Sequence, residues 1–156
     1  MKEVDEIVKA GADILAVDAT DRMNSNGKKA YEIITEIRKK YPEHLILADV
    51  RNAEEAKHAL ELGAHMAAPT LYRFGDNPKS TDSPDFEELA KMVQVCEGLG
   101  LIIMEGKIST PEEAIQSLYL GAHAVVVGSA ITRPHLTTLR FTSMMNKYKR
   151  KIPLKY

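Results

Sequence analysis

The stretch LILADVRNAEEAKHALELGAHMAAPT, residues 45–70, decides the fold because it holds a complete strand–helix–strand pattern. Its two short apolar runs, at 45–48 and 66–68, are typical of strands buried on both faces of a parallel sheet. Between them, Asn52 followed by Glu55 predicts a capping box at a helix start, and Gly63 suits the left-handed residue at its end. The stretch therefore predicts one βα unit followed by the next strand.

The same pattern continues on both sides of this stretch. Apolar runs at 14–17, 101–104 and 124–127 bring the predicted strands to five, and apolar residues at helical spacing occupy 30, 33, 34 and 37, and again 86, 89, 93 and 96. The segment Ser83-Pro84-Asp85 predicts a cap for the helix that begins at Phe86, without the matching Glu, and Thr110 with Pro111 and Glu113 predicts a second capping box. Apolar residues between 136 and 145 indicate a final helix that covers the sheet. This alternation predicts an α/β fold with a parallel sheet.

An internal repeat suggests how the units are organised. EEA at 54–56 followed by LGAH at 62–65 recurs 58 positions later, at 112–114 and 120–123, and a weaker copy, AGAD, stands at 10–13. A spacing of about 55 residues covers two βα units, as in a (β/α)₈ barrel of the TIM type and unlike a solenoid of short repeats.

The number of strands is small for such a barrel. The strand starts are roughly 27 residues apart, so eight units would need about 220 residues, and the chain has 156. The alternatives are a smaller open α/β sheet, or one partial TIM-barrel domain over residues 1–156. In the second case about five C-terminal βα units are present and about three N-terminal units are absent from the chain. We expect the incomplete barrel.

Composition excludes several classes of protein. The formal net charge is −1, with 21 basic and 22 acidic residues, whereas a dedicated nucleic-acid binder usually has a large basic surplus. No apolar run approaches the roughly 20 residues of a membrane helix, and the acidic start is unlike a signal peptide. One cysteine cannot form an internal disulfide. We expect a soluble cytoplasmic domain that binds neither nucleic acid nor membrane.

Two glycine turns predict a phosphate site. Ligands of parallel βα folds bind at the carboxyl ends of the strands, where Gly106 and Gly128 follow the last two apolar runs. Glycine allows the backbone to approach an anion closely and leaves its N–H groups free to donate. Because Lys107, Ser129 and Arg133 are close in sequence, a phosphate site is favoured over two plain strand-to-helix turns.

Two carboxylates at the same edge are candidates for proton transfer. Asp18 and Glu105 each follow an apolar run, and a carboxylate in a partly dry pocket has a pKa tuned towards neutrality. The alternative is structural: Asp18 orients a loop, and Glu105 pairs with Lys107 or Arg133.

Most other notable residues favour structural roles. Asp49 is interpreted as a turn residue, whereas Thr70, at the end of the third strand, is a candidate substrate contact. Cys96 lies on an apolar helix stripe and is interpreted as inert core. His65 and His123 directly precede strands, which places them at the opposite rim. The histidines lack metal-ligand spacing, so no metal site is predicted.

Five segments together resemble one enzyme family. They are GADILAVDAT (11–20), ADV and EEA within 48–56, SPDFEEL (83–89), MEGKISTPEEA (104–114) and GAHAVVVGSAITRP (121–134). The chain resembles the N-acylglucosamine-6-phosphate 2-epimerases over about residues 1–145. The resemblance implies a (β/α)₈ barrel that interconverts N-acetylmannosamine 6-phosphate and N-acetylglucosamine 6-phosphate without a cofactor, in sialic-acid catabolism. A base removes the C2 proton beside the open-chain aldehyde, and a proton returns to the other face.

The resemblance also implies roles for individual residues. Glu105 matches the catalytic glutamate and Asp18 an aspartate in the substrate pocket. The positions expected to hold the phosphate or the sugar are Gly106, Lys107, Gly128, Ser129 and Arg133.

The chain departs from the family at several points. The family's catalytic lysine and a phosphate-contacting arginine lie on earlier strands that have no counterpart here. Residues 69–75 replace the usual TTLSGYT, and Lys107 replaces the commoner arginine. We therefore expect little epimerase activity from the chain alone, and association as a homo-oligomer or through edge strands. The alternative function is an inactive phosphosugar-binding or partner-binding barrel remnant. A metal-dependent pentose-phosphate epimerase is disfavoured because the strand ends lack His and Asp ligands.

Overall fold

Five parallel strands form one open sheet in the computed structural model, which describes residues 1–25, 27–71 and 83–148. The strands are β1 (Ile14–Asp18), β2 (Leu45–Asp49), β3 (Met66–Ala68), β4 (Leu101–Glu105) and β5 (Ala124–Val126), and they lie side by side in chain order. All five predicted strands and the α/β class are confirmed.

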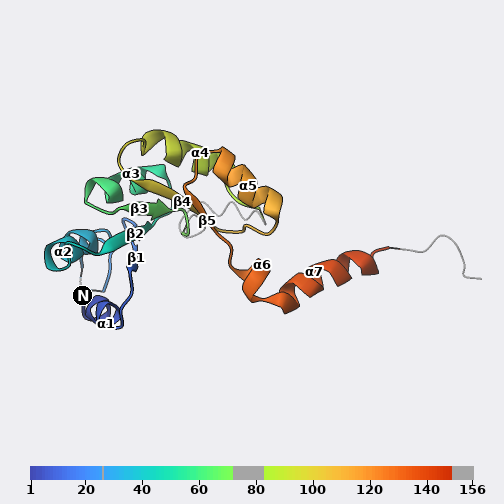
Figure 1. Cartoon of the computed structure of the whole chain (residues 1–156), viewed down its shortest axis with the longest axis horizontal. Helices are drawn as coiled ribbons and strands as arrows, with labels where there is room; N and C mark the ends of the chain where they lie inside the picture. Colours follow the sequence, from blue (N-terminus) through green and yellow to red (C-terminus); the bar gives the residue numbers. More distant parts are fainter. Residues whose placement is uncertain (26, 72–82, 149–156) are drawn as a thin grey trace, which may run out of the picture.

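Helices follow or precede each strand (Figure 1). They are α1 (Lys2–Lys9), α2 (Glu32–Lys40), α3 (Ala53–Glu61), α4 (Phe86–Val95), α5 (Pro111–Tyr119), α6 (Ser129–Thr132) and α7 (Pro134–Asn146).

The core lies between the sheet and the helices. Successive residues of a strand point to opposite faces of the sheet, and one set packs against the apolar stripes of the helices. These strand residues are at most 3% exposed, and the helix residues that meet them are fully buried: Leu15, Ile46, Ala67 and Ile102 from the strands, with Ile34, Ile37, Ala56, Leu89 and Met92 from the helices.

On the opposite face of the sheet, no helix of the described residues joins the apolar cluster. We call this face of the sheet the open face. It consists of the alternate strand residues, which share one side of the sheet because of their register: Ile14, Ala16, Asp18, Leu45, Leu47, Asp49, Met66, Ala68, Leu101, Ile103, Glu105, Ala124 and Val126. Its apolar part is exposed near the amino ends of the strands, where Ile14, Leu45 and Leu101 are each more than 40% exposed.

The last two helices stand apart from the sheet. α7 projects away from the body of the structure (Figure 1), and none of its residues is buried. Phe141, Met144 and Met145 are each about two-thirds exposed. The prediction of a final helix is confirmed, but the prediction that it covers the sheet is wrong, because α7 packs on α6 and leaves its apolar residues in solvent.

The predicted helix ends are largely confirmed. Thr110 and Glu113 form a capping box, and the Asp85 carboxylate accepts from Glu88 N–H. Only half of the other capping box forms: Asn52 accepts from Glu55 N–H, but the Glu55 carboxylate turns to the backbone N–H of Arg51 instead.

The internal repeat has a structural meaning at the amino ends of the strands. Gly63 and Gly121 have φ of +105° and +103°, so each ends its helix in a left-handed turn. The histidine two residues later then reaches back to the preceding strand. His65 Nδ1 accepts from Ile46 N–H at 3.1 Å, and His123 Nδ1 accepts from Ile102 N–H at 3.1 Å. Both histidines lie at the rim opposite the site, as predicted.

The histidine contact predicts a pH-dependent stability. Burial, with the nearby charge of Arg38, lowers the pKa of His65 from 6.5. Its stabilisation is therefore present above pH 6.5 and lost as the pH falls below that value. His65→Leu leaves Ile46 N–H buried without an acceptor, so we expect a loss of about 1–3 kcal/mol at pH 8 in urea denaturation.

His65→Asn is the matched control, because its side-chain oxygen occupies the place of Nδ1 and does not titrate. We expect this variant to stay near the wild type at pH 8 and to lack the fall below pH 6.5. A similar fall in His65→Asn would assign the pH dependence to other groups.

Candidate functional site

Three carboxylates lie at the carboxyl end of the open face. Asp18, Asp49 and Glu105 are the last residues of β1, β2 and β4. Asp18 and Asp49 face each other in register, and all three lie on the open face of the sheet. Each is half-buried. The structure therefore brings together both predicted proton-transfer residues and Asp49, which was interpreted as a turn residue.

The surroundings tune these carboxylates differently. Burial raises the pKa of Glu105, and the carboxylate of Asp49 raises it further. Burial also raises the pKa of Asp49; the Thr70 hydroxyl opposes this, and Asp18 adds repulsion. For Asp18, burial is outweighed by the hydrogen bonds of Thr20 and the ion pair with Arg22, so its pKa is lowered. Asp18 is thus held ionised, whereas the pKa values of Asp49 and Glu105 are shifted upwards, towards neutral pH.

No lysine or arginine among the described residues forms an ion pair with Asp49 or Glu105. The alternative in which Glu105 pairs with Lys107 or Arg133 is therefore wrong for this part of the chain. A carboxylate with raised pKa and without a cation is suited to exchange protons rather than to hold a loop.

Asp49→Asn is expected to show how much these carboxylates oppose folding. A raised folded-state pKa favours the protonated form, so its stabilisation is complete below pH 3.8 and is lost as the pH rises through the folded-state pKa. At pH 7 Asp49→Asn should therefore withstand more urea than the wild type, and the difference should shrink as the pH falls towards 3.8. The pKa of Glu105, followed by carboxyl NMR titration, should fall in the same variant. An unchanged Glu105 titration would contradict the coupling.

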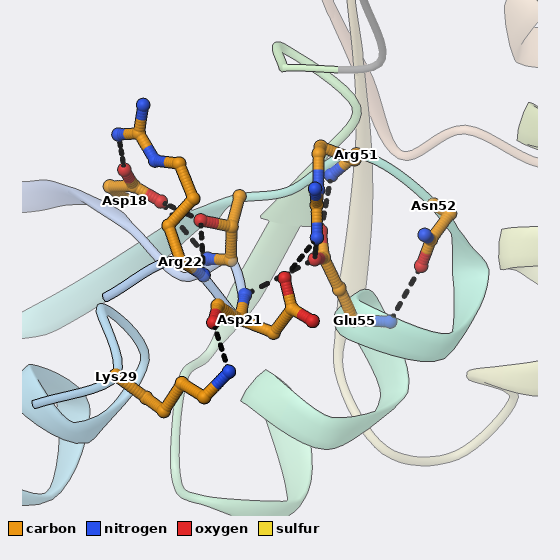
Figure 2. A network of polar contacts seen from close by, with 8 residues as sticks. Asp18, Asp21, Arg22, Lys29, Arg51, Asn52 and Glu55 are labelled. Atoms are coloured by element: carbon orange, nitrogen blue, oxygen red, sulfur yellow. Dashed lines mark hydrogen bonds and ion pairs between the residues drawn. The ribbon is translucent and has the colours of Figure 1, made fainter. Parts of the chain in front are cut away.

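A polar network holds the loops that follow Asp18 and Asp49 (Figure 2). Glu55, at the start of α3, accepts from Asp21 N–H at 3.2 Å and from Arg51 N–H at 2.8 Å. The Arg51 guanidinium donates to Glu55 from Nε at 2.9 Å and pairs with Asp21. Lys29 Nζ donates to Asp21 O at 2.6 Å. Glu55 therefore ties the loop after β1 to the loop after β2.

Thr70 lies beside this group at the end of the third unit. Its hydroxyl is close enough to lower the pKa of Asp49, but its oxygen is buried and meets no atom of the described residues in hydrogen-bond geometry. Since a buried hydroxyl normally has a partner, Thr70 stays a candidate substrate contact. Residues 72–75 of the departing segment lie outside the described residues.

The turn after β4 is held in a strained form by its own helix. Gly106 has φ of +117°, and Lys107 has φ of +62°, unusual for a residue with a side chain. Glu113 accepts from Ser109 N–H at 2.7 Å and Thr110 N–H at 3.1 Å, and these bonds lower its pKa against the effect of burial. Glu113 and Glu55 occupy the same position in the two copies of the internal repeat. Each accepts from the backbone N–H of the residue four positions earlier, Ser109 for Glu113 and Arg51 for Glu55.

A cavity of about 380 Å³ lies between this turn and the last two helices. It brings together two predicted phosphate-site residues, Lys107 and Ser129, with Ser109 and Arg140. Arg133, which precedes α7, does not line it. Arg140 was not predicted, because its approach depends on how α7 leaves α6. The only sequence signal for this position is helical spacing. Arg140 lies three and four residues after Thr137 and Leu136, which places the three side chains on one side of a helix.

The described residues hold few features of other kinds of site. No group of three or more His, Cys, Asp or Glu within them could hold a metal ion. No helix in the described ranges is long and apolar enough to cross a membrane. Cys96 is buried, as predicted, and burial raises its pKa.

Comparison with known proteins gives consistent matches. Residues 1–147 match the model of a family described as "Putative N-acetylmannosamine-6-phosphate epimerase". A relative of that name from Caldanaerobacter subterraneus subsp. tengcongensis is 42% identical over 150 residues, which are 94% of this chain and 61% of the relative. One from Listeria welshimeri is 42% identical over 147 residues, 94% of this chain and 62% of the relative. The chain thus spans just over three-fifths of the length of these curated relatives.

Solved structures give the same picture. The N-acetylmannosamine-6-phosphate 2-epimerase of Clostridium perfringens superposes with a TM-score of 0.82 at 40% identity, covering 92% of this chain and 61% of that one. Mandelate oxidase superposes with a TM-score of 0.64 at 17% identity, which supports the barrel-type fold alone. The incomplete TIM-type barrel is confirmed.

Proposed function

The chain belongs to the N-acetylmannosamine-6-phosphate epimerase family, and on that premise we propose that it supplies the acid–base and phosphate-binding parts of such an enzyme. The reaction interconverts N-acetylmannosamine 6-phosphate and N-acetylglucosamine 6-phosphate by moving the proton at C2. As a catalyst for phosphorylated sugars, it would act in the cytoplasm.

The observation that carries this proposal is the state of Glu105. It is half-buried at the carboxyl end of the sheet with a raised pKa and without an ion-pairing cation in the described part of the chain. Such a group exchanges a proton with C2 on the face against which it lies, because its two protonation states are closer in free energy near neutral pH; the proton on the other face comes from a second donor. Asp18, held ionised by Arg22 and Thr20, is assigned to accept hydrogen bonds from sugar hydroxyls.

The phosphate is assigned to the turns after β4 and β5. Gly106, Lys107, Gly128, Ser129 and Arg133 were predicted for it, and the cavity that joins Lys107 to Ser129 supports this assignment. A phosphate fixed there would supply binding energy that positions C2 against Glu105, the last residue of β4, which directly precedes the first of these turns.

Binding of the phosphorylated sugar tests the assignment. N-acetylmannosamine 6-phosphate is expected to shift the amide NMR signals of the turns at 106–109 and 128–130, whereas unphosphorylated N-acetylmannosamine should not. Lys107→Ala should weaken binding about 10–100-fold, the loss of one charge-assisted contact of about 1.5–3 kcal/mol. Lys91→Ala, which removes an exposed lysine of α4, is the control. Equal weakening in both variants would refute the assignment.

Turnover needs one further group. Removing the C2 proton builds negative charge on the aldehyde oxygen, which requires a donor or cation close by. The described residues bring no such cation to Glu105, and the family's lysine lies on a strand without counterpart here. This favours the second candidate for the chain alone, binding of the phosphosugar without turnover. Activity is therefore best tested in a fusion protein, with the N-terminal region of the Caldanaerobacter relative that lies outside the match placed ahead of Met1.

A further inference from the structure

The two copies of the internal repeat differ at the residue that each glutamate holds. In the first copy the Arg51 guanidinium donates to Glu55 from Nε at 2.9 Å, and its side chain is only 23% exposed. In the second copy position 109 is a serine, whose uncharged hydroxyl donates to Glu113 at 2.9 Å. No cation of the described residues forms an ion pair with Glu113. The second glutamate therefore lacks the cation that the first has within its own turn.

The shorter side chain borders the cavity of about 380 Å³. Ser109 lines this cavity together with Lys107 and Ser129, whereas in the first copy the long side chain of Arg51 occupies the space beside its glutamate. A serine in place of an arginine thus leaves room for a ligand next to Lys107. The same change removes a positive charge from the turn.

A cation reaches the cavity from another element. Arg140, on α7, lines it from the side opposite the turn. Burial raises the pKa of Glu113, but the hydrogen bonds of Ser109 and Thr110, together with the positive charge of Arg140, outweigh this effect and lower it. The charge that is missing at position 109 is therefore supplied from across the cavity, and the space beside the turn stays open.

We propose that Arg140 is a positioning residue, which takes in the second copy of the repeat the part that Arg51 has in the first. From the far side of the cavity it favours the ionised form of Glu113, which accepts stronger hydrogen bonds than the neutral form. Glu113 in turn holds the turn at 106–110 in the form that presents Lys107 to the cavity. The proposal deepens the proposed function and rests on it only where a phosphate is placed in this cavity.

Hydrogen exchange of the free chain, followed by NMR at pH 7, tests the positioning role without any ligand. Arg140→Ala should speed exchange at the amides of Ser109 and Thr110 about 2–5-fold, the usual loss for an exposed charge interaction. Arg140→Lys should restore the wild-type rates, because a charge that acts over a distance does not require the guanidinium shape. The amide of Arg51 is the internal reference and should not change. Equal exchange in Arg140→Ala and in the wild type would overturn the proposal.

Lys147→Ala is the matched control for the loss of charge. It removes one positive charge at the end of the same helix, outside the lining of the cavity. We expect it to leave the amides of Ser109 and Thr110 as slow as in the wild type. Faster exchange in this variant, to the same extent as in Arg140→Ala, would assign the effect to net charge and contradict the role of Arg140.

Returning an arginine to position 109 separates the effect of charge from that of space. In a double variant, Arg140→Ala with Ser109→Arg, the new guanidinium can reach Glu113 as Arg51 reaches Glu55, so the Thr110 amide should exchange slowly again. The same side chain would fill the cavity, so N-acetylmannosamine 6-phosphate should bind about 10-fold more weakly than to Arg140→Ala alone.

Fast exchange in this double variant, or binding as strong as in Arg140→Ala alone, would contradict the equivalence of the two copies. The two proposals fail in different ways. A wild-type chain that does not bind the sugar phosphate would refute the proposed function, and the exchange rates of the free chain would still decide the role of Arg140.

Discussion

Glu105→Gln in the fusion protein is expected to reduce the rate of epimer interconversion by about 10²–10⁴-fold, the usual contribution of a positioned acid–base group. Glutamine keeps the size and hydrogen-bonding ability of the side chain but cannot take the C2 proton. Because burial and the Asp49 carboxylate raise the pKa of Glu105 above 4.5, the wild-type rate should rise with pH through that higher value, and the variant should lack this limb.

The matched control is Glu112→Gln, which changes an exposed glutamate in the first turn of the neighbouring helix α5. We expect it to leave the rate within a factor of two. NMR of the sugar anomeric signals measures both rates. If Glu105→Gln kept more than a third of the wild-type rate, Glu105 would not be the base.

The second large effect is on stability. Glu55→Ala is expected to lower the free energy of unfolding by about 2–4 kcal/mol, because it leaves two loop amides without their acceptor and the Arg51 guanidinium without its main partner. The Glu55 side chain is only 11% exposed, so water replaces these contacts poorly. Figure 2 shows Glu55 between Asp21 and Arg51, so the variant loses the side chain that links the loops after β1 and β2.

Glu54→Ala is the control for this change, since Glu54 is exposed and lies in the same first turn of α3. Both variants remove one negative charge from the helix start, worth about 0.3–1 kcal/mol. Only Glu55→Ala removes the link between the loops. Urea denaturation at pH 7 measures the free energy of unfolding of both variants. An equal loss in the two would mean that Glu55 contributes only its charge at the helix start and not the link between the loops.

The fold could be predicted from local signals. Each strand is a short apolar run between polar residues, and α3, α4 and α5 each start at a side-chain cap, so the five strands needed no knowledge of distant contacts. The positions after the strands then indicated Asp18, Glu105 and Lys107 as residues of one edge.

What the sequence did not reveal depends on contacts between units. In the sequence, Asp49 is interpreted as a turn residue. Its role changes once β2 is placed beside β1, because Asp49 then lies opposite Asp18 and near Glu105. The half-formed capping box at Asn52 is similar: Glu55 forms part of a motif within its helix, but the loop after β1 brings Asp21 N–H to it. Arg140 joins Lys107 only through the packing of α7 on α6. None of these has a periodic signal along the chain.

Deuterium uptake at C2 is the most direct test of the role assigned to the carboxyl end of this sheet. N-acetylmannosamine 6-phosphate is incubated in D₂O with the fusion protein, with its Glu105→Gln variant and with the chain alone. We expect one deuterium at C2, in both epimers, from the fusion protein, and uptake at least 100-fold slower from the other two. Epimerisation without deuterium at C2, or equal uptake in the Glu105→Gln fusion, would contradict proton transfer by Glu105.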